Sequence, residues 1–355
     1  PDANYRIGRL FLRVNQIGEA AASFAAELER HPGHAAAARE LGLAWARLGE
    51  PERAIAQLEL LTRRQPKEGE NWRALGYAYS GAGRLAEAER ALRRAIALPP
   101  ANAVAHRDLG FVLAATNRPD EARAEYRRAL AIAPDDAGTR LNLGSLDRRQ
   151  GDAGAALDEY RAAERLDSTL TPALKGQAAV LMELNRQAEA GAVYRRLLAL
   201  EPADVEARFA AVRLFDALGR GDVALELARD GVRHDLGSAD ARLILGLALE
   251  AQDDRRGAAR ELRRAEALSP DSTHRARARS LLDTLSRQAS DSLRTVFAAD
   301  SADFARAPAV APRSVHGRAR PTPGPAASAS PSPSPMAVPP ERTDSLFLPV
   351  APDSQ

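Results

Sequence analysis

Three arginines recur at intervals of 34 residues, and one lysine lies two further intervals along the chain. These cations are Arg39, Arg73, Arg107 and Lys175. A guanidinium group presents a planar fork of N–H donors that can bind a carboxylate through two parallel hydrogen bonds. If one face of the fold carries these side chains, they form an arginine ladder for the carboxylates of an extended acidic peptide. The alternative is a solvated wall neutralised by Glu40, Glu70 and Asp108, because exposed ion pairs are weak.

The other residues that could do chemistry form no catalytic or metal-binding set. None of the six histidines belongs to a ligand motif of two histidines one helical turn apart with a glutamate. His31 and His34 are expected in a solvated loop, and His106 in a packing role. The chain has no cysteine, which excludes a thiolate metal site, and it has no phosphate loop or nucleophile elbow. We therefore predict no cofactor, no metal and no enzymatic activity.

Composition favours an all-α protein without a membrane span. Hydrophobic residues make up 45% of the 355 residues but aromatic residues only 5%, so alanine and leucine must build most of the core. Alanine is the strongest helix former, whereas strands are enriched in β-branched and aromatic residues. No apolar run approaches the roughly 18 residues that cross a bilayer. The 50 Lys and Arg residues balance 48 Asp and Glu residues, which argues against bulk nucleic-acid binding.

The 34-residue interval of the arginines extends through most of the chain. Cut at that period, residues 1–272 give eight units without insertion or deletion: 1–34, 35–68, 69–102, 103–136, 137–170, 171–204, 205–238 and 239–272. Position 20 of the unit is alanine in every copy, position 8 is glycine in six, and position 15 is always glycine, asparagine or aspartate. Such self-similarity at a fixed period indicates a repeat protein.

Each unit is predicted to form two helices joined by a short turn. In residues 69–102, Trp72, Gly76 and Tyr79 share the spacing of one helical face (helix A), and a second face begins at Leu85 (helix B). Gly83, at position 15, supplies the left-handed residue that ends helix A. Glycine at position 8 and alanine at position 20 let the two helix backbones approach closely, while the larger residue at position 24 fills the margin.

This pattern resembles the tetratricopeptide repeat. The resemblance rests on mostly apolar residues at positions 7 and 11, glycine at 8, alanine at 20, aromatic or leucine at 24 and proline at 32, and it covers residues 1–272. It implies an α-solenoid, a right-handed superhelix in which helices A line a concave groove and helices B the convex side. Copies six and seven depart most, so we expect the stack to bend or loosen there. The departures are Gln177, Ala211, Val212, Ala228 and Gly231.

Two further segments follow the repeats. Residues 273–288 predict a capping helix whose apolar stripe is Ala278, Leu281, Leu282 and Leu285. Residues 289–355, rich in Pro, Ala and Ser, predict a disordered tail, because so little apolar area cannot offset the entropy of ordering. Two apolar islands, 293–297 and 344–350, could dock in the protein's own groove; an inert linker is the alternative.

The compartment stays open, because the chain begins at Pro1 rather than at a methionine. We favour the cytoplasm and keep export to the periplasm as the alternative. The first repeat starts abruptly at Pro1, so we expect a segment upstream of it.

The resemblance also implies where partners bind. In this family they usually lie in the concave groove, on helix A positions 2, 5, 9, 12 and 13. The candidate groove residues are Tyr5, Arg9, Arg39, Arg73, Tyr77, Arg107, Phe111, Arg148, Arg149 and Lys175. Position 9 is never asparagine, so the clamp for a terminal carboxylate that one branch of the family carries is not transferred to this chain.

We expect a non-enzymatic scaffold or adaptor that binds extended or helical protein segments, acidic ones among them, in this groove. The alternative is a polyanion-binding or RNA-binding array that uses the groove arginines, with Tyr77 and Phe111 as stacking surfaces. Self-association and docking of the tail into the groove stay open as well.

Overall fold

The computed structural model describes residues 2–100, 102–269 and 272–288, and in these ranges the chain forms seventeen α-helices and no strand. The all-α fold class predicted from composition is therefore confirmed. The predicted tail, residues 289–355, and its two apolar islands lie outside the described residues. No helix in the described ranges combines the length and the apolarity that a membrane span needs.

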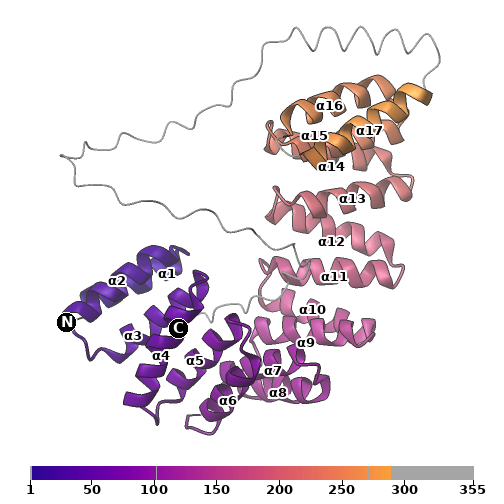
Figure 1. Cartoon of the computed structure of the whole chain (residues 1–355). Helices are drawn as coiled ribbons and strands as arrows, with labels where there is room; N and C mark the ends of the chain where they lie inside the picture. Colours follow the sequence, from indigo (N-terminus) through magenta and orange to yellow (C-terminus); the bar gives the residue numbers. More distant parts are fainter. Residues whose placement is uncertain (1, 101, 270–271, 289–355) are drawn as a thin grey trace, which may run out of the picture. The chain divides into compact units, whose positions relative to one another are not determined.

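Each 34-residue repeat forms one antiparallel pair of helices, as predicted (Figure 1). The first helices are α1 (Ala3–Arg13), α3 (Ala35–Arg47), α5 (Gly69–Gly81), α7 (Ala103–Ala115), α9 (Ala137–Arg149), α11 (Thr171–Glu183), α13 (Val205–Ala217) and α15 (Ala239–Ala251). The second helices are α2 (Ile17–Arg30), α4 (Pro51–Arg64), α6 (Leu85–Ile96), α8 (Pro119–Ile132), α10 (Ala153–Leu166), α12 (Gln187–Leu200), α14 (Gly221–His234) and α16 (Arg255–Leu268). One more helix, α17 (Ser272–Gln288), follows the last repeat.

The chain divides into two compact units between Ala207 and Arg208. Unit 1 holds the first six repeats, α1 to α12, and unit 2 holds the last two repeats with α17. Each unit by itself is a stack of helix pairs, the arrangement of an α-solenoid. The division falls inside α13, in repeat seven, one of the two copies in which the sequence pattern departs most.

Position 8 is where the two helices of a repeat come closest. A Cβ atom on Gly110 would lie 2.7 Å from the ring of Tyr126, the residue at position 24. A Cβ atom on Gly76 would lie 3.3 Å from the carbonyl oxygen of Ala88, at position 20. The position 20 alanines are fully buried in all eight repeats. In a close-packed interior such contacts leave no space for a methyl group, so the predicted close approach at positions 8 and 20 is confirmed.

The turn inside each repeat contains one residue with a left-handed backbone. The φ angle at position 15 lies between +56° and +81° in every copy: Asn15, Gly49, Gly83, Asn117, Gly151, Asn185, Gly219 and Asp253. Glycine has no Cβ to clash there, and Asn and Asp are the side chains that visit this region most readily. The prediction for this position is confirmed in all eight repeats.

One departure from the repeat pattern makes room for a buried cation in unit 2. Gly231 stands at position 27, where half the repeats have alanine, and a Cβ atom on it would lie 2.5 Å from Cδ of Arg208. Arg208 is 2% exposed, and its Nη1 donates to the carbonyl oxygen of Leu227 at 2.6 Å. The glycine and the arginine therefore depend on each other.

Helix α17 covers the last repeat, as predicted. It packs on α16, and its Ala278 and Leu285 side chains are each 1% exposed. Leu281 and Leu282 pack against the same apolar cluster of unit 2. The predicted stripe of four apolar residues is the contact face of this helix.

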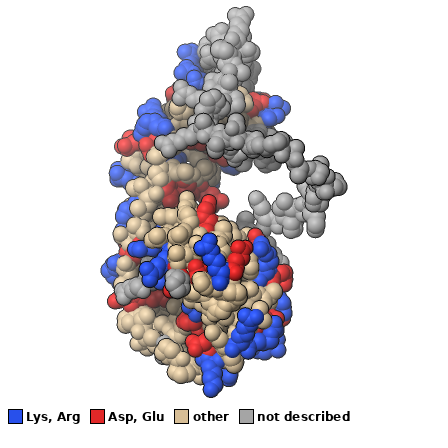
Figure 2. Space-filling model, turned by 90° about the vertical axis from the view of Figure 1, so that its left-hand side faces the viewer, with Lys and Arg blue, Asp and Glu red and all other residues tan. Residues whose placement is uncertain are grey.

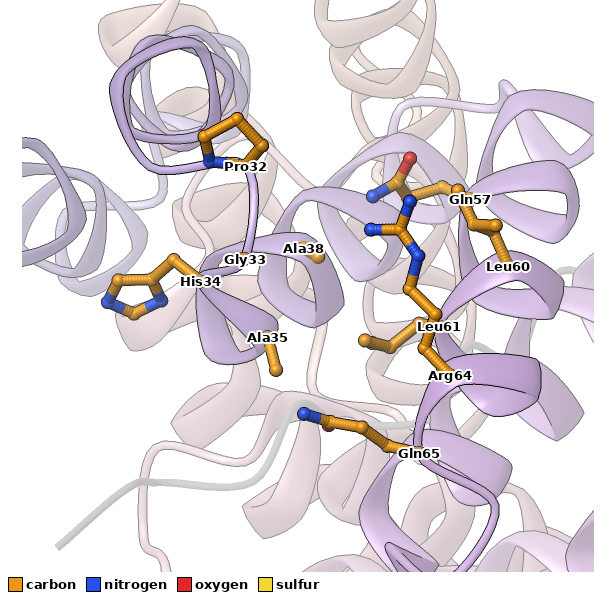
Figure 3. A pocket seen from close by; sticks show the side chains of 10 residues that line it. All are labelled: Pro32, Gly33, His34, Ala35, Ala38, Gln57, Leu60, Leu61, Arg64 and Gln65. Carbon is orange, nitrogen blue, oxygen red and sulfur yellow. The ribbon is translucent and has the colours of Figure 1, made fainter.

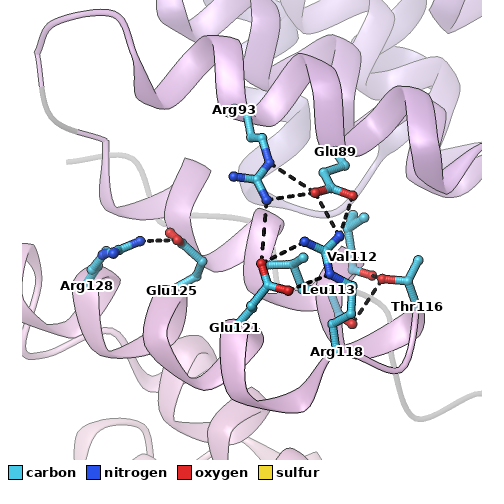
Figure 4. A network of polar contacts seen from close by, with 9 residues as sticks. All are labelled: Glu89, Arg93, Val112, Leu113, Thr116, Arg118, Glu121, Glu125 and Arg128. Carbon is cyan, nitrogen blue, oxygen red and sulfur yellow. Dashed lines mark hydrogen bonds and ion pairs between the residues drawn. The ribbon is translucent and has the colours of Figure 1, made fainter.

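An ion-pair network links α6 and α8 between repeats three and four (Figure 4). Arg118 donates to both carboxylate oxygens of Glu89 at 2.9 and 2.8 Å, and to both of Glu121 at 2.7 Å. Arg93 donates to Glu89 at 2.8 and 3.0 Å. Burial raises the pKa of Glu89, but the hydrogen bonds from Arg118 and Arg93 outweigh it, so the pKa is lowered. The hydrogen bond from Arg118 also lowers the pKa of Glu121.

We expect Gly110→Ala to destabilise the protein by about 1–3 kcal/mol, the range for overpacking a core, because the added methyl group would meet the Tyr126 ring. Gly18→Ala is the matched control, since Gly18 also lies in a helix but has no atom within 4 Å of a Cβ position. There, alanine should be neutral or stabilising. Chemical denaturation followed by circular dichroism measures both variants, and equal effects would contradict a packing role for position 8.

The network in Figure 4 predicts an acid-sensitive contribution to stability. Because the folded-state pKa values of Glu89 and Glu121 are lowered, the contribution is present at neutral pH and is lost as the pH falls through those values. Glu89→Gln should lower the Tm at pH 7 by a few degrees at most, since such pairs are weak, and should lose less Tm between about pH 5 and pH 3. Glu29→Gln, at an exposed site on α2, is the control. Parallel Tm curves for wild type and Glu89→Gln would refute the prediction.

Candidate functional site

The first helices of consecutive repeats contact one another from α3 through α11 in unit 1. They form a continuous surface, which we call the A-helix face and define by positions 9, 12 and 13 of α3, α5 and α7. These positions share one side of a helix because they are three and four residues apart. On this face lie Leu43, Ala46, Arg47, Tyr77, Ser80, Gly81, Phe111, Ala114 and Ala115.

A row of three large apolar side chains runs across the A-helix face at position 9. Leu43, Tyr77 and Phe111 come from three consecutive repeats, and each is half-buried. Leu43 and Phe111 pack against the core of unit 1. Next to Tyr77 and Phe111, position 13 holds the small exposed residues Gly81 and Ala115, which offer no bulk to cover the rings. The row is therefore a surface that a partner's apolar side chains could contact.

Tyr77 brings a polar group into this row. Among the residues that the structure describes, none hydrogen-bonds its hydroxyl group. Burial raises the pKa of Tyr77, the nearby cation of Arg47 opposes the rise, and the carboxylate of Asp108 adds to it. The hydroxyl group is therefore protonated at neutral pH and can both donate and accept a hydrogen bond.

Most cations of the predicted arginine ladder make contacts within the protein. Arg73 and Arg107 are 7% and 4% exposed, and both pair with the buried carboxylate of Asp108, at 3.4 and 3.6 Å. Arg73 also pairs with Glu70 at 3.0 Å, and Arg107 with Asp136 at 3.1 Å. Burial lowers the pKa of Arg73, but Asp108 and Glu70 raise it by more, so the guanidinium stays charged. Arg73 thus joins repeat three to repeat four, and Arg107 pairs with Asp136, the residue that caps α9.

The remaining candidates from the sequence fall into two groups. Several have partners within the protein: Arg39 donates to Asn71 at 3.4 Å, Arg148 pairs with Glu183 at 2.7 Å, Lys175 pairs with Asp204 at 2.7 Å, and Tyr5 stacks near Phe24 with ring centroids 5.8 Å apart. Arg9 and Arg149 are exposed, and Arg149 donates to the carbonyl oxygen of Ala114 at 3.3 Å. The structure thus brings Tyr77 and Phe111 together on one face, while Arg73 and Arg107 lie beneath the surface.

Sequence reasoning missed two exposed cations at position 13, although Arg149, at the same position of repeat five, was among the candidates. Arg13 and Arg47 occupy this position in repeats one and two, and both are exposed. Arg47 makes one contact of 3.4 Å, to Asn15 Oδ1, and neither Arg13 nor Arg9 takes part in an ion pair within the described part of the chain. The signal was available, since position 13 belongs to the groove wall. Arg47 is an exposed positive charge on the A-helix face that acts on Tyr77, and Arg13 holds the equivalent position on α1.

One group of side chains has the composition of a metal site. Asp2, Glu27 and His34 place one potential ligand atom each within 4.8 Å of one another. Contacts within the protein account for this arrangement: Glu27 accepts a hydrogen bond from the Asp2 amide at 3.2 Å, and His34 Nδ1 accepts one from the Ala37 amide at 3.1 Å. His34 is half-buried and caps α3, rather than lying in a solvated loop as expected, whereas His31 is exposed. His106 is half-buried, with Nδ1 2.6 Å from Glu125.

Solved structures resemble this chain at low sequence identity, which shows the fold alone. PilF of Pseudomonas aeruginosa is 19% identical, with a TM-score of 0.50 over 62% of this chain and 97% of that chain. A monomeric mutant of IFIT1 with Gppp-AAAA is 16% identical, with a TM-score of 0.50 over 71% and 68%. A chain of the Cut9–Hcn1 hetero-tetramer of the APC/C is 17% identical, with a TM-score of 0.49 over 76% of this chain and 52% of that chain. This chain therefore spans about half the length of that relative.

A comparison with curated proteins gives no match. A family model of the tetratricopeptide repeat matches residues 5–68, 141–205 and 209–273, more than half of the chain. A second model of the same repeat matches residues 80–141, so the matches follow the helix pairs from α1 to α16. On these grounds, the chain belongs to the tetratricopeptide repeat family.

Proposed function

We propose that this protein is a non-enzymatic scaffold whose A-helix face binds an extended segment of a protein partner. Tetratricopeptide repeat proteins generally mediate protein–protein interactions. The observation that carries the proposal is the row of half-buried side chains at position 9, Leu43, Tyr77 and Phe111, in three consecutive repeats. Aromatic side chains that combine an apolar ring with a polar group are typical of the residues that dominate binding energy at interfaces.

The surroundings of the row indicate what the bound segment contains. Apolar side chains of the partner would pack against the Leu43, Tyr77 and Phe111 side chains, and the Tyr77 hydroxyl group would take a backbone hydrogen bond. The exposed Arg47 lies at the end of the face nearest the first repeat, and Arg13 holds the equivalent position on α1. An acidic residue at that end of the segment would gain charge-assisted hydrogen bonds. The proposed ligand is therefore an extended segment with apolar residues followed by an acidic one.

A polyanion such as RNA fits this face less well. The backbone of a nucleic acid needs a track of cations with no carboxylates alongside. Here Arg73, Arg107 and Lys175 are already paired with carboxylates. Figure 2 shows Lys and Arg interspersed with Asp and Glu on the face that it presents, rather than one continuous basic area. A protein segment is the better supported ligand.

Binding to the row can be tested with peptides selected from a random dodecapeptide library on the full chain. The double variant Tyr77→Ala, Phe111→Ala should bind these peptides at least about tenfold more weakly, because truncating central aromatic residues costs 1 kcal/mol or more. Arg47→Glu should weaken peptides with an acidic residue most. Ile132→Ala, an exposed apolar residue on α8, is the control. Unchanged affinity in the double variant, measured by fluorescence anisotropy, would reject the proposed face.

Stability measurements distinguish the buried arginines from binding residues. Asp108→Asn keeps the shape of the side chain but removes the charge between Arg73 and Arg107, so we expect a loss on the order of 3 kcal/mol in the free energy of unfolding. Asp135→Asn, at an exposed site in the turn after α8, should change it little. Urea denaturation gives both values. An Asp108→Asn variant as stable as wild type would show that the arginines do not depend on this pairing.

A further inference from the structure

The side chain at position 4 of the repeat contacts the turn that precedes the first helix. In three repeats its side chain donates a hydrogen bond to the carbonyl oxygen of position 32 in the repeat before. Trp72 Nε1 donates to Pro66 at 3.0 Å, Arg140 Nη2 to Pro134 at 3.4 Å, and Arg242 Nη2 to Leu236 at 2.8 Å. A planar side chain with an N–H donor therefore covers this turn in each of these repeats.

Repeat two lacks that side chain. Its position 4 is Ala38, and a cavity of about 70 Å³ lies beside it (Figure 3). The residues around the cavity correspond to those around Trp72 in repeat three: the turn at Pro32 and Gly33 on one side, and the C-terminal half of α4 on the other. Among the described residues, none donates a hydrogen bond to the Pro32 carbonyl oxygen. The cavity thus presents both the space and the free acceptor that Trp72 uses one repeat later.

The rim of the cavity is apolar where other repeats are charged. Leu60 stands at position 26 and is 39% exposed. The same position in four other repeats is arginine: Arg94, Arg128, Arg196 and Arg264. Leu61, which is 5% exposed, also lines the cavity. An exposed leucine beside a cavity favours an apolar ring as the ligand.

The polar groups around the cavity favour a neutral ligand over a cation. In two of the three repeats with an arginine at position 4, a glutamate at position 23 pairs with it, as Arg140 does with Glu159 at 3.1 Å and Arg242 with Glu261 at 2.8 Å; in repeat seven, Arg208 pairs with Asp230 at 3.7 Å instead. In repeat two, position 23 is the neutral Gln57, and Figure 3 shows the Arg64 guanidinium beside it. An arginine of a partner would lack a carboxylate and meet a like charge.

We propose that this cavity binds a tryptophan side chain of a partner protein, with the indole N–H donating to the Pro32 carbonyl oxygen and the ring lying over Ala38, Leu60 and Leu61. The chain has only two tryptophans. Trp72 donates to Pro66 of the preceding repeat, and Trp45 packs against the core with Arg53 over its ring at 4.3 Å. The tryptophan therefore comes from another protein. This site is separate from the proposed A-helix face.

The test uses N-acetyl-L-tryptophanamide as the probe and the full chain, with amide chemical shifts as the readout. We expect saturable shifts at Gly33, His34 and Gln65 with a dissociation constant in the millimolar range, which suits so small a ligand. The analogue methylated at the indole nitrogen should bind about fivefold more weakly or worse, because it has lost one hydrogen bond. The absence of saturable shifts at these amides, or equal binding of the methylated analogue, would overturn the proposal.

Ala38→Trp gives a second, independent measurement. The new indole should fill the cavity as Trp72 does, raise the Tm and abolish binding of the probe. Ala115→Trp, at an exposed alanine of α7, is the matched control and should keep the shifts at Gly33 and His34. Undiminished probe binding in a folded Ala38→Trp variant would place the probe elsewhere and refute the site. If that variant does not fold, the comparison of the two probes on the wild-type chain decides the question.

Discussion

In six of the eight repeats, a glycine at position 8 of the first helix lies directly against the side chain at position 24 of the second. A glycine such as Gly110 faces the Tyr126 ring so closely that no Cβ atom fits. This contact sets the distance between the two helices, and the left-handed residue at position 15 sets the turn that joins them. Since every repeat has the left-handed residue at position 15 and six of the eight have glycine at position 8, equivalent positions along each stack have similar surroundings. A solenoid is stable only because each of these repeats also packs against its neighbours.

The ion pairs between repeats depend on that regular spacing and determine which charges reach the surface. Asp108 lies between Arg73 and Arg107 because the two arginines occupy the same position in adjacent repeats. Asp136 caps α9 through the Gly138 amide at 3.0 Å and accepts from Arg107 as well. Buried ion pairs are stable only when their geometry and hydrogen bonds offset desolvation. These arginines therefore help to hold the repeats together, and the accessible chemistry of the A-helix face lies in the apolar row and in Arg47.

Those features of the fold that follow from one residue and its own backbone could be predicted from the sequence. Position 15 needs a left-handed backbone and position 8 needs the absence of a side chain, so residue type alone identified both. The burial of Arg73 could not be predicted in this way, because it depends on Asp108, 35 residues later, and on how closely α5 and α7 approach. The same holds for the contact of His34 with Asp2 at 3.1 Å, which joins residues 32 positions apart, whereas the His34 cap of α3 through the Ala37 amide is local. The cavity at Ala38 arises from a missing side chain, which a search for functional groups does not find.

Because all repeats share one set of positions, those positions also show where the two surfaces proposed for binding lie relative to each other. Positions 4 and 9 of a first helix are five residues apart, which is about 140° around the helix axis at 3.6 residues per turn. The cavity beside Ala38 and the row at position 9 therefore lie on different sides of the first helices. A ligand in one does not exclude a ligand from the other, and a substitution in one leaves the contacts of the other in place. A single partner could reach both only by passing around the edge of the helix stack, whereas two partners could bind at the same time, as a scaffold requires.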